Sequence, residues 1–262
     1  MKNSSLGLEN EIFIIKELNG KKINETSDNF RYMLFDMFKN YPKDSVLDVR
    51  KVPHKYLCKT DIEIHVQGTY ENVSIKTGFS PAVHQEEFES FMLFLKELKI
   101  SKKTLNFIRF YHYADETYDG SGTKTLRLVE FWEKYAKEIK EASEELSNPL
   151  IVKAVLYRCV IKGKRDTLQN INYLYYGDHI KGVFVHRNDL LTKIGTLENR
   201  DVPYLHIGPF KYVQKIFRSQ VVDGRYVQYT QLCWPYIKED MIAMFKQTWV
   251  YKTGRVPLPS LD

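Results

Sequence analysis

The stretch "KTDIEIHVQGTYENVSIKTG", residues 59–78, decides the fold. Its first half places Asp61, Glu63 and His65 at every second position, with isoleucines between them. Its second half continues the polar pattern with Ser74 and Lys76. Because side chains alternate across a strand, each half has one polar and one apolar face. The pattern predicts a hairpin of two strands within residues 60–77.

The position of the turn sets which side chains meet across the hairpin. If residues 68–71 form the turn, Glu63 lies opposite Lys76, and Asp61 is a diagonal neighbour of Lys76 within reach of a long side chain. Two interpretations remain open at this point. The polar face is either a solvated surface with a Glu63–Lys76 ion pair or a catalytic site.

A carboxylate in the first expected helix adds to this pattern. Residues 5–18 are predicted to be helical, with Leu8, Ile12 and Ile15 on one apolar stripe. Glu11 falls within that apolar arc. A buried lone charge is costly, so Glu11 needs a partner, either a metal ion or a lysine.

A further helix is expected directly after the hairpin, over residues 78–99. Ser80 is a natural N-cap, and Pro81 suits the first helical position. The first turns of this helix carry several acids, including Glu86 and Glu89, and lie close in sequence to Lys76. These acids either complement the helix dipole or belong to the same site. Other helices are expected at residues 27–39, 101–110, 125–144 and 148–158.

Composition excludes several classes of protein. The 262 residues are 43% hydrophobic and 27% charged, as in an ordinary globular protein, and suit one large domain or a core with a smaller subdomain. No apolar run approaches the roughly 20 residues that span a bilayer, and the N-terminus lacks a signal-peptide core. We therefore expect a cytoplasmic protein. Cys58, Cys159 and Cys233 form no C-x-x-C pair, which argues against disulfides and a zinc site.

The N-terminal and C-terminal parts of the chain differ in expected secondary structure and in charge. Residues 1–150 hold 22 Lys and Arg against 24 Asp and Glu, whereas residues 151–262 hold 17 against 9. After about residue 160 the sequence changes to short strands and turns. A basic, β-rich C-terminal part beside an acid-richer front suits a polyanion-binding surface next to a carboxylate-bearing site.

The segments "KTDI", "VSIKTG" and "HQEEF" resemble the core of the PD-(D/E)XK nuclease superfamily, and more narrowly type II restriction endonucleases. Members carry an Asp on one strand, an acid–x–Lys triplet on the next strand, and often a Glu on a preceding helix. By resemblance, Asp61 matches the Asp, Lys76 the Lys and Glu11 the helical Glu. Ser74 stands where the second acid is expected, which is a departure from the pattern.

The resemblance implies an α/β restriction-endonuclease-like core, a mixed central sheet flanked by helices, with a β-rich C-terminal region. Residues 1–160 would be the nuclease core and residues 161–262 the DNA-recognition subdomain. Some members supply the missing acid from the helix after the lysine strand, where Glu86 and Glu89 are the candidates. One or two Mg²⁺ ions would be held by Asp61, one of these glutamates and the Ile75 carbonyl. Lys76 would then orient or deprotonate the attacking water.

The implied function is Mg²⁺-dependent cleavage of double-stranded DNA at a short specific sequence, by a homodimer that cuts both strands of a palindromic site. A cognate DNA methyltransferase encoded nearby would complete a restriction system. Two alternatives remain open: a structure-specific or nicking nuclease of the same fold, and a catalytically inactive nucleic-acid-binding protein in which Ser74 marks a dead site.

DNA contacts are expected in the basic C-terminal part. Lys162, Lys164 and Arg165 suit phosphate contacts, which position the protein without reading sequence. Strand alternation in residues 211–218 places Gln214 and Arg218 on one face. Glutamine suits adenine and arginine suits guanine in the major groove, so these two residues are the candidates for base recognition.

Overall fold

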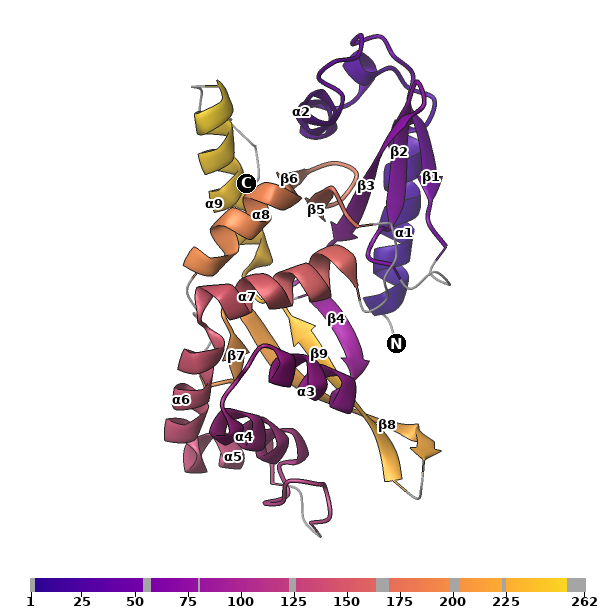
Figure 1. Ribbon diagram of the computed structural model, residues 1–262. Coiled ribbons are helices and arrows are strands. Elements are labelled where there is room, and N and C mark those ends of the chain that lie inside the picture. The colour runs from indigo at the N-terminus through magenta and orange to yellow at the C-terminus, as the bar shows by residue number, and fades with distance from the viewer. Residues whose placement is uncertain are drawn as a thin grey trace. The chain divides into compact units, whose positions relative to one another are not determined.

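The computed structural model describes residues 3–53, 58–79, 81–122, 126–163, 170–197, 203–222 and 225–253. The strands in these ranges form two sheets, one of five strands in the order β1-β2-β3-β5-β6 and one of four in the order β4-β9-β8-β7 (Figure 1). Helices accompany both sheets. The fold is therefore α/β with a mixed sheet flanked by helices, as expected.

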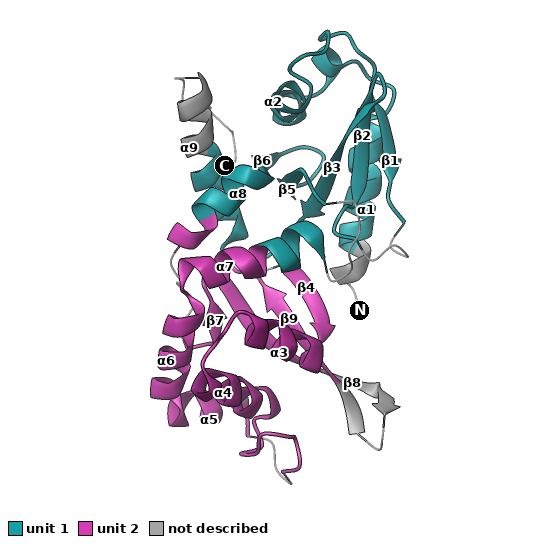
Figure 2. Ribbon diagram, viewed as in Figure 1, with its two compact units in different colours: residues 1–81, 157–193, 236–262 teal, residues 82–156, 194–235 magenta. Residues whose placement is uncertain are grey.

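The chain divides into two compact units, and each contains one of the sheets (Figure 2). The first unit comprises residues 1–81, 157–193 and 236–262, and the second comprises residues 82–156 and 194–235. The units are thus interleaved along the sequence, and the expected boundary at residue 160 does not separate them. The assignment of DNA recognition to residues 161–262 stays a prediction.

The first unit is built on the five-stranded sheet. Its strands are β1 (Asp48–Lys51), β2 (Ile62–Val66), β3 (Thr69–Lys76), β5 (Tyr173–Gly177) and β6 (Gly182–His186). Strands β3 and β5 run parallel, and the other neighbouring pairs of this sheet are antiparallel. Strand β3 is therefore the central strand of the sheet, and its last four residues pair with β5.

The hairpin of β2 and β3 has a tighter turn than expected. The turn consists of Gln67 and Gly68, with φ values of 47° and 85°. Glu63 lies opposite Asn72, so the expected register that paired Glu63 with Lys76 is wrong. A two-residue turn with two positive φ values matches the twist of the strands, which explains why it prevails over a longer loop. The predicted alternation is confirmed: the three apolar residues of β2 are buried, and the polar residues between them are half-buried.

Helix α1 (Asn3–Leu18) lies along β1 in Figure 1, but with a different face inward than expected. Glu11, Ile14 and Leu18 are buried, whereas Leu8 and Ile12 are about two-fifths exposed, at 41% and 40%. The expected stripe is therefore wrong at Leu8 and Ile12. Both rows have helical spacing, and contact with the sheet selects the row at positions 11, 14 and 18.

The remaining helices of the first unit pack near β5 and β6. Helix α2 (Asp28–Met37) follows Ser27 as expected and contacts β6. Helices α8 (Arg187–Lys193) and α9 (Ile237–Thr253) contact each other and β6, although strands and turns were expected in this part of the sequence. The rings of Phe184 and Phe245 meet at 4.9 Å and join β6 to α9. A short 3-10 helix covers Ile23–Glu25.

The second unit is built on an antiparallel sheet. Its strands are β4 (Ala82–Glu87), β7 (His206–Ile207), β8 (Phe210–Val222) and β9 (Arg225–Cys233). The strands expected in this C-terminal sequence are confirmed. Strand β4 is a correction, because a helix was expected there, with Ser80, which lies outside the described residues, as its cap. The helix α3 (Phe88–Glu97) begins only after it.

Helices α3 to α7 complete the second unit, and Figure 1 shows α3 beside β4 and β9. The Ser101 hydroxyl accepts the Thr104 N–H and starts α4 (Lys102–Tyr113). The helix expected over residues 125–144 is divided into α5 (Leu128–Lys134) and α6 (Ala136–Leu146). Helix α7 (Pro149–Leu156) leads into a π-helical segment, Tyr157–Lys162, and a 3-10 turn covers Ile194–Thr196. In the described part of the chain, no helix has the length and apolar content to cross a membrane.

Candidate active site

The Asp61 carboxylate lies at the start of β2, where its backbone N–H donates to the Val73 carbonyl across the hairpin. One of its oxygens, Oδ2, accepts from three donors of β3: the Ile75 N–H at 2.6 Å, the Ser74 hydroxyl at 3.0 Å and the Lys76 ammonium at 3.4 Å. Hydrogen bonds to a carboxylate are stronger than those between neutral groups. The arrangement therefore fixes this oxygen against the end of β3.

The Lys76 ammonium completes the cluster. It donates to the Ser74 hydroxyl and to the Ile75 carbonyl, both at 2.9 Å, in addition to its ion pair with Asp61. The side chains of Asp61 and Lys76 are only 15% and 17% exposed, so water screens this pair less than a surface pair. The structure therefore brings together Asp61, Ser74, Ile75 and Lys76. Because Ile62 lies opposite Val73, Asp61 falls opposite Ser74, and Lys76 reaches it from the diagonal position, as expected.

Glu11 reaches the same end of the sheet from α1. It is 8% exposed, and its carboxylate pairs with Lys51 of β1 at 3.1 Å. Lys51 lies opposite Ile62 in the register, and Val52 donates its N–H to the Asp61 carbonyl, so the pair is next to Asp61 along the strands. Residues opposite in an antiparallel pair share a face, which places Lys51 on the Ile62 face, not on the face of Asp61.

The partner of Glu11 is thus a lysine, one of the two kinds that the sequence allowed. The sequence analysis did not single out Lys51. Its position two residues after Val49, at the end of a short strand that pairs with the hairpin, is the signal that could have identified it. A catalytic role for Glu11 stays a prediction.

The polar face of β2 continues away from Asp61 as a charged surface. The Glu63 carboxylate and the His65 ring lie 3.1 Å apart. On the neighbouring strand β1, Arg50 pairs with Asp48. The Arg50 guanidinium holds the pKa of the exposed Asp48 carboxyl below its usual range. Glu63 and His65, each about one-fifth exposed, thus contact each other on this half-buried face, and Glu63 lies opposite Asn72, not opposite Lys76 as the solvated interpretation expected.

A cysteine near the cluster is not activated. Burial raises the pKa of the Cys58 thiol, hydrogen bonding to backbone lowers it, and the negative charges of Asp61 and Glu63 raise it again, with a net increase. A thiol with a raised pKa is a poor nucleophile at neutral pH. The chemistry of this end of the sheet therefore depends on oxygen donors and an ammonium group.

Glu86 and Glu89, the candidates for the missing acid, belong to the other compact unit. Glu86 is 3% exposed on β4, where it pairs with His84 at 2.9 Å and accepts from the Ser90 hydroxyl at 3.0 Å. Glu89 lies on α3 and forms a two-point ion pair with Arg109, at 2.5 and 2.7 Å. Both carboxylates thus have protein partners, and their roles as metal ligands stay predictions.

The candidates for DNA contact have different surroundings. Gln214 shares a face of β8 with the buried Tyr212 and donates from its side chain to the Tyr111 carbonyl of α4. Lys162 ends the π-helical segment. Lys164 and Arg165 lie outside the described residues, as does the side chain of Arg218. Base recognition and phosphate contact by these residues stay predictions.

Comparison with known proteins gives a structural match. No protein-family model and no curated protein matches the chain. A crystal structure of the restriction endonuclease MspI in complex with its cognate DNA aligns with 89% of this chain and 93% of that one, with a TM-score of 0.51 and 12% sequence identity. The chain therefore has the fold of a restriction endonuclease, and the mixed α/β core expected from the sequence is confirmed.

Proposed function

We propose that this chain is a Mg²⁺-dependent endonuclease that cleaves double-stranded DNA at a short specific sequence, as a type II restriction enzyme does. The observation that carries the proposal is the contact between the Asp61 carboxylate and the Lys76 ammonium, 3.4 Å apart at the end of the central hairpin. The fold supports it, because the similar protein MspI was crystallised with its cognate DNA. The sequence pattern D-x12-S-x-K supplies the same residues independently.

The residues of the cluster fit a hard divalent cation. The Asp61 carboxylate, the Ser74 hydroxyl and the Ile75 carbonyl are oxygen donors, the ligand type that Mg²⁺ prefers. The Ser74 hydroxyl and the Ile75 carbonyl each accept a hydrogen bond from the Lys76 ammonium, and the Ser74 hydroxyl donates to Asp61. Asp61 and the Ile75 carbonyl would hold the ion. When bound, Mg²⁺ would supply positive charge where negative charge develops on the phosphate.

The protein groups have separate tasks in this proposal. Lys76 would supply positive charge and hydrogen-bond donors at the point where the scissile phosphate and the attacking water must meet. The Ser74 hydroxyl contacts both Asp61 and Lys76, so it holds the acid and the ammonium group in one geometry. Such preorganisation stabilises the transition state because the groups do not have to reorient during the reaction.

Partners follow from the same proposal. A single cluster of this kind cuts one strand at a time, so a homodimer would place one cluster at each strand of a palindromic site. A cognate methyltransferase would protect the host DNA. The second acid of the site would come from Glu86 or Glu89. Glu11, which pairs with Lys51 on the Ile62 face, would act from the first helix without contacting Asp61.

The experiment is incubation of the purified chain with a mixture of plasmid DNAs and Mg²⁺, with and without EDTA. Discrete fragments that EDTA abolishes are expected. The variants Asp61→Asn and Lys76→Ala should give no fragments, whereas Lys39→Ala, which removes an exposed lysine of the same unit, should cut normally.

Glu86→Gln and Glu89→Gln, tested in parallel, should show which acid is required, since only one of them should abolish cutting. A smear instead of fragments would indicate a non-specific nuclease. Intact DNA under all metal conditions, together with retained DNA binding, would indicate an inactive binding protein and would refute the proposed activity.

A further inference from the structure

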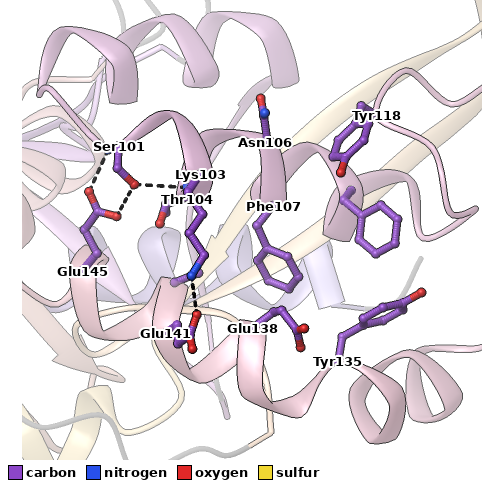
Figure 3. A pocket seen from close by; sticks show the side chains of 12 residues that line it. Ser101, Lys103, Thr104, Asn106, Phe107, Tyr118, Tyr135, Glu138, Glu141 and Glu145 are labelled. Atoms are coloured by element: carbon purple, nitrogen blue, oxygen red, sulfur yellow. Dashed lines mark hydrogen bonds and ion pairs between the residues drawn. The ribbon is translucent and has the colours of Figure 1, made fainter.

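A pocket of about 480 Å³ lies in the second unit, apart from the proposed nuclease cluster. It is bounded by α4, by α6 and by the loop that contains Tyr118. Its volume falls within the range of small-molecule sites in proteins. Figure 3 shows its lining, with α4 and α6 on opposite sides and the Phe107 side chain projecting between them.

Four aromatic side chains form one end of the pocket. They are Phe107, Phe110, Tyr118 and Tyr135. The Phe110 ring meets Tyr135 edge-on at 4.9 Å and Tyr118 at 5.7 Å, so rings from three chain segments cluster at this end. The Lys134 ammonium lies 5.3 Å from the centroid of the Tyr135 ring, which shows that this ring accepts a cation. Aromatic faces carry partial negative charge and attract cations, and the attraction is strongest where several rings surround the charge.

Three carboxylates of α6 also line the pocket. Glu138, Glu141 and Glu145 follow the helical spacing of three and four residues. Lys103 pairs with Glu141 at 2.6 Å, and the Ser101 N–H and hydroxyl both donate to Glu145 at 2.7 Å. Glu138 is exposed and lies nearest the rings, beside Tyr135 in Figure 3.

The pocket is negatively charged at neutral pH. The Lys103 ammonium holds the pKa of Glu141 below its usual range. Burial opposes ionisation of Glu145, but hydrogen bonds from Thr104 and Ser101 lower its pKa overall. The lining holds three carboxylates and the Lys103 ammonium, and Lys137 outside the lining lies 3.9 Å from Glu141. The lining itself is therefore more negative than positive, which suits a cation better than a DNA phosphate.

We propose that this pocket binds an organic cation: an ammonium or guanidinium group on an apolar body, with the charge between the Glu138 carboxylate and the aromatic rings. The apolar body would fill the space along Phe107 and Phe110, and Glu138 would neutralise the charge. The proposal rests on residues of the second unit and does not depend on the nuclease activity. The same chemistry could come from a free amine or from an Arg or Lys side chain of another protein.

The test is an NMR titration of the full chain, with ¹³C-labelled Phe and Tyr rings, at constant ionic strength. The probes are choline, the neutral isostere 3,3-dimethyl-1-butanol and N-acetyl-arginine amide. One of the two cations should shift the ring signals of Tyr118 and Phe107 and bind roughly three- to thirtyfold more tightly than the neutral alcohol. Tighter binding of choline would point to a free amine, and tighter binding of the arginine amide to a protein side chain.

Matched variants separate charge and aromatic effects from simple loss of structure. Glu138→Gln should weaken the cation about three- to fivefold. Glu144→Gln, which removes another exposed carboxylate of α6 outside the pocket lining, should leave binding unchanged. Tyr118→Leu keeps an apolar wall but removes the aromatic face, so it should weaken binding, whereas Tyr118→Phe should not.

Three results would overturn the proposal. The first is the absence of ring shifts with either cation. The second is binding of the neutral alcohol as tightly as the cations, which would make the pocket merely apolar. The third is an equal effect of Glu138→Gln and Glu144→Gln, since the charge would then act through the general field of the unit and not within the pocket.

Discussion

At Asp61 one carboxylate oxygen accepts from a backbone N–H, a hydroxyl and an ammonium group, all from one segment of β3. Ser74, which stands where an acid was expected, therefore takes part in the cluster. Its hydroxyl accepts from Lys76 and donates to Asp61, so it links the two charged groups. A serine can orient these groups, but it cannot supply the negative charge of a second acid.

This geometry predicts a graded loss of activity along the cluster. Asp61→Asn and Lys76→Ala should reduce cleavage to background, because each removes a charge that the transition state requires. Ser74→Ala should retain activity, reduced by roughly ten- to a hundredfold, since it removes hydrogen bonds to charged groups worth about 1.5–3 kcal/mol but leaves both charges in place. Single-turnover cleavage rates of a defined plasmid measure the three variants.

A Ser74→Ala enzyme as inactive as Asp61→Asn would show that the hydroxyl is itself an essential ligand. Lys39→Ala is the control for loss of a surface charge in the same unit.

A buried histidine of the second unit gives a pH-dependent stability. His112 is 1% exposed, lies face to face with Phe88 at 3.8 Å and hydrogen-bonds Tyr212 at 2.7 Å. Burial lowers its pKa from 6.5 to about 3. Above the pKa of this histidine in the unfolded chain, the imidazole is neutral in both the folded and the unfolded state, and the full stability is present. Between that pKa and the lower pKa of the folded state, only the unfolded chain takes up the proton, so the free energy of unfolding falls as the pH falls.

We therefore expect this histidine to reduce the free energy of unfolding by up to about 1.4 kcal/mol for each pH unit between 6.5 and about 3. The variant His112→Gln should be less stable than the wild type near neutral pH, because the stacking on Phe88 is lost. Its free energy of unfolding should also depend less on pH, because the titrating group is absent. Urea unfolding of the wild type and the variant at several pH values provides the comparison. His179→Gln controls for removal of a less buried imidazole. Equal slopes for wild type and His112→Gln would contradict the assignment.

At the scale of elements, two glycines illustrate opposite local requirements. Gly68 has φ +85° in the hairpin turn, and Gly7 lies within α1, where an added Cβ would meet nothing within 4 Å. Gly68→Ala should lower the free energy of unfolding by about 1–2 kcal/mol, because L-residues are strained at positive φ. Gly7→Ala should raise it by up to about 1 kcal/mol through helix propensity.

Denaturant unfolding of both variants tests the turn and the helix together. Because both substitutions add the same methyl group, opposite signs would arise from backbone conformation alone. A stabilising Gly68→Ala would show that the turn is not the two-residue type described.

The sequence predicted elements whose period is fixed locally. The alternation of β2, the helix after Ser27 and the helical part of residues 78–99 that forms α3 all follow from nearby residues, and all are present. The site residues Asp61 and Lys76 could be predicted to meet, because they belong to adjacent strands of one hairpin. The contact survives the wrong register because Lys76 is a diagonal neighbour of Asp61 in both the expected and the observed register, and its long side chain spans the diagonal.

Elements that depend on distant partners could not be predicted in the same way. The segment "HQEEF" contains good helix formers, yet residues 82–87 form a strand because β9 supplies backbone hydrogen bonds opposite Gln85 and Glu86. The inward face of α1 is likewise chosen by the sheet and not by the helix alone. Arg109 as the partner of Glu89, and Lys51 as the partner of Glu11, arise from the same long-range packing.

At the scale of the whole molecule, the sequence places most of its excess positive charge after residue 150. If Lys162, Lys164 and Arg165 contact phosphates, neutralising all three should flatten the salt dependence of DNA binding by up to about three units in its logarithmic slope. The preferred sequence should not change, because phosphate contacts carry no base information. Gel-shift titrations at several salt concentrations, on specific and scrambled duplexes, would show both effects.

Substitution of Asp61 can separate DNA binding from cleavage. Without metal, the Asp61 carboxylate repels DNA phosphates, and the Lys76 ammonium offsets part of that charge. Asp61→Asn removes the negative charge and keeps a side chain of the same shape, so it should bind specific DNA at least as tightly as the wild type in EDTA. It should nevertheless leave the DNA intact when Mg²⁺ is added, because a neutral side-chain amide is a weaker ligand for the ion than a carboxylate.

Lys76→Ala is the matched opposite in this experiment. It removes a positive charge from the same cluster, so it should bind more weakly in EDTA and also fail to cut. Two inactive variants that differ in affinity in opposite directions would place the cluster beside the bound phosphate. Equal affinities for wild type, Asp61→Asn and Lys76→Ala would mean that DNA does not approach this end of the sheet, and the proposed active site would then have to be abandoned.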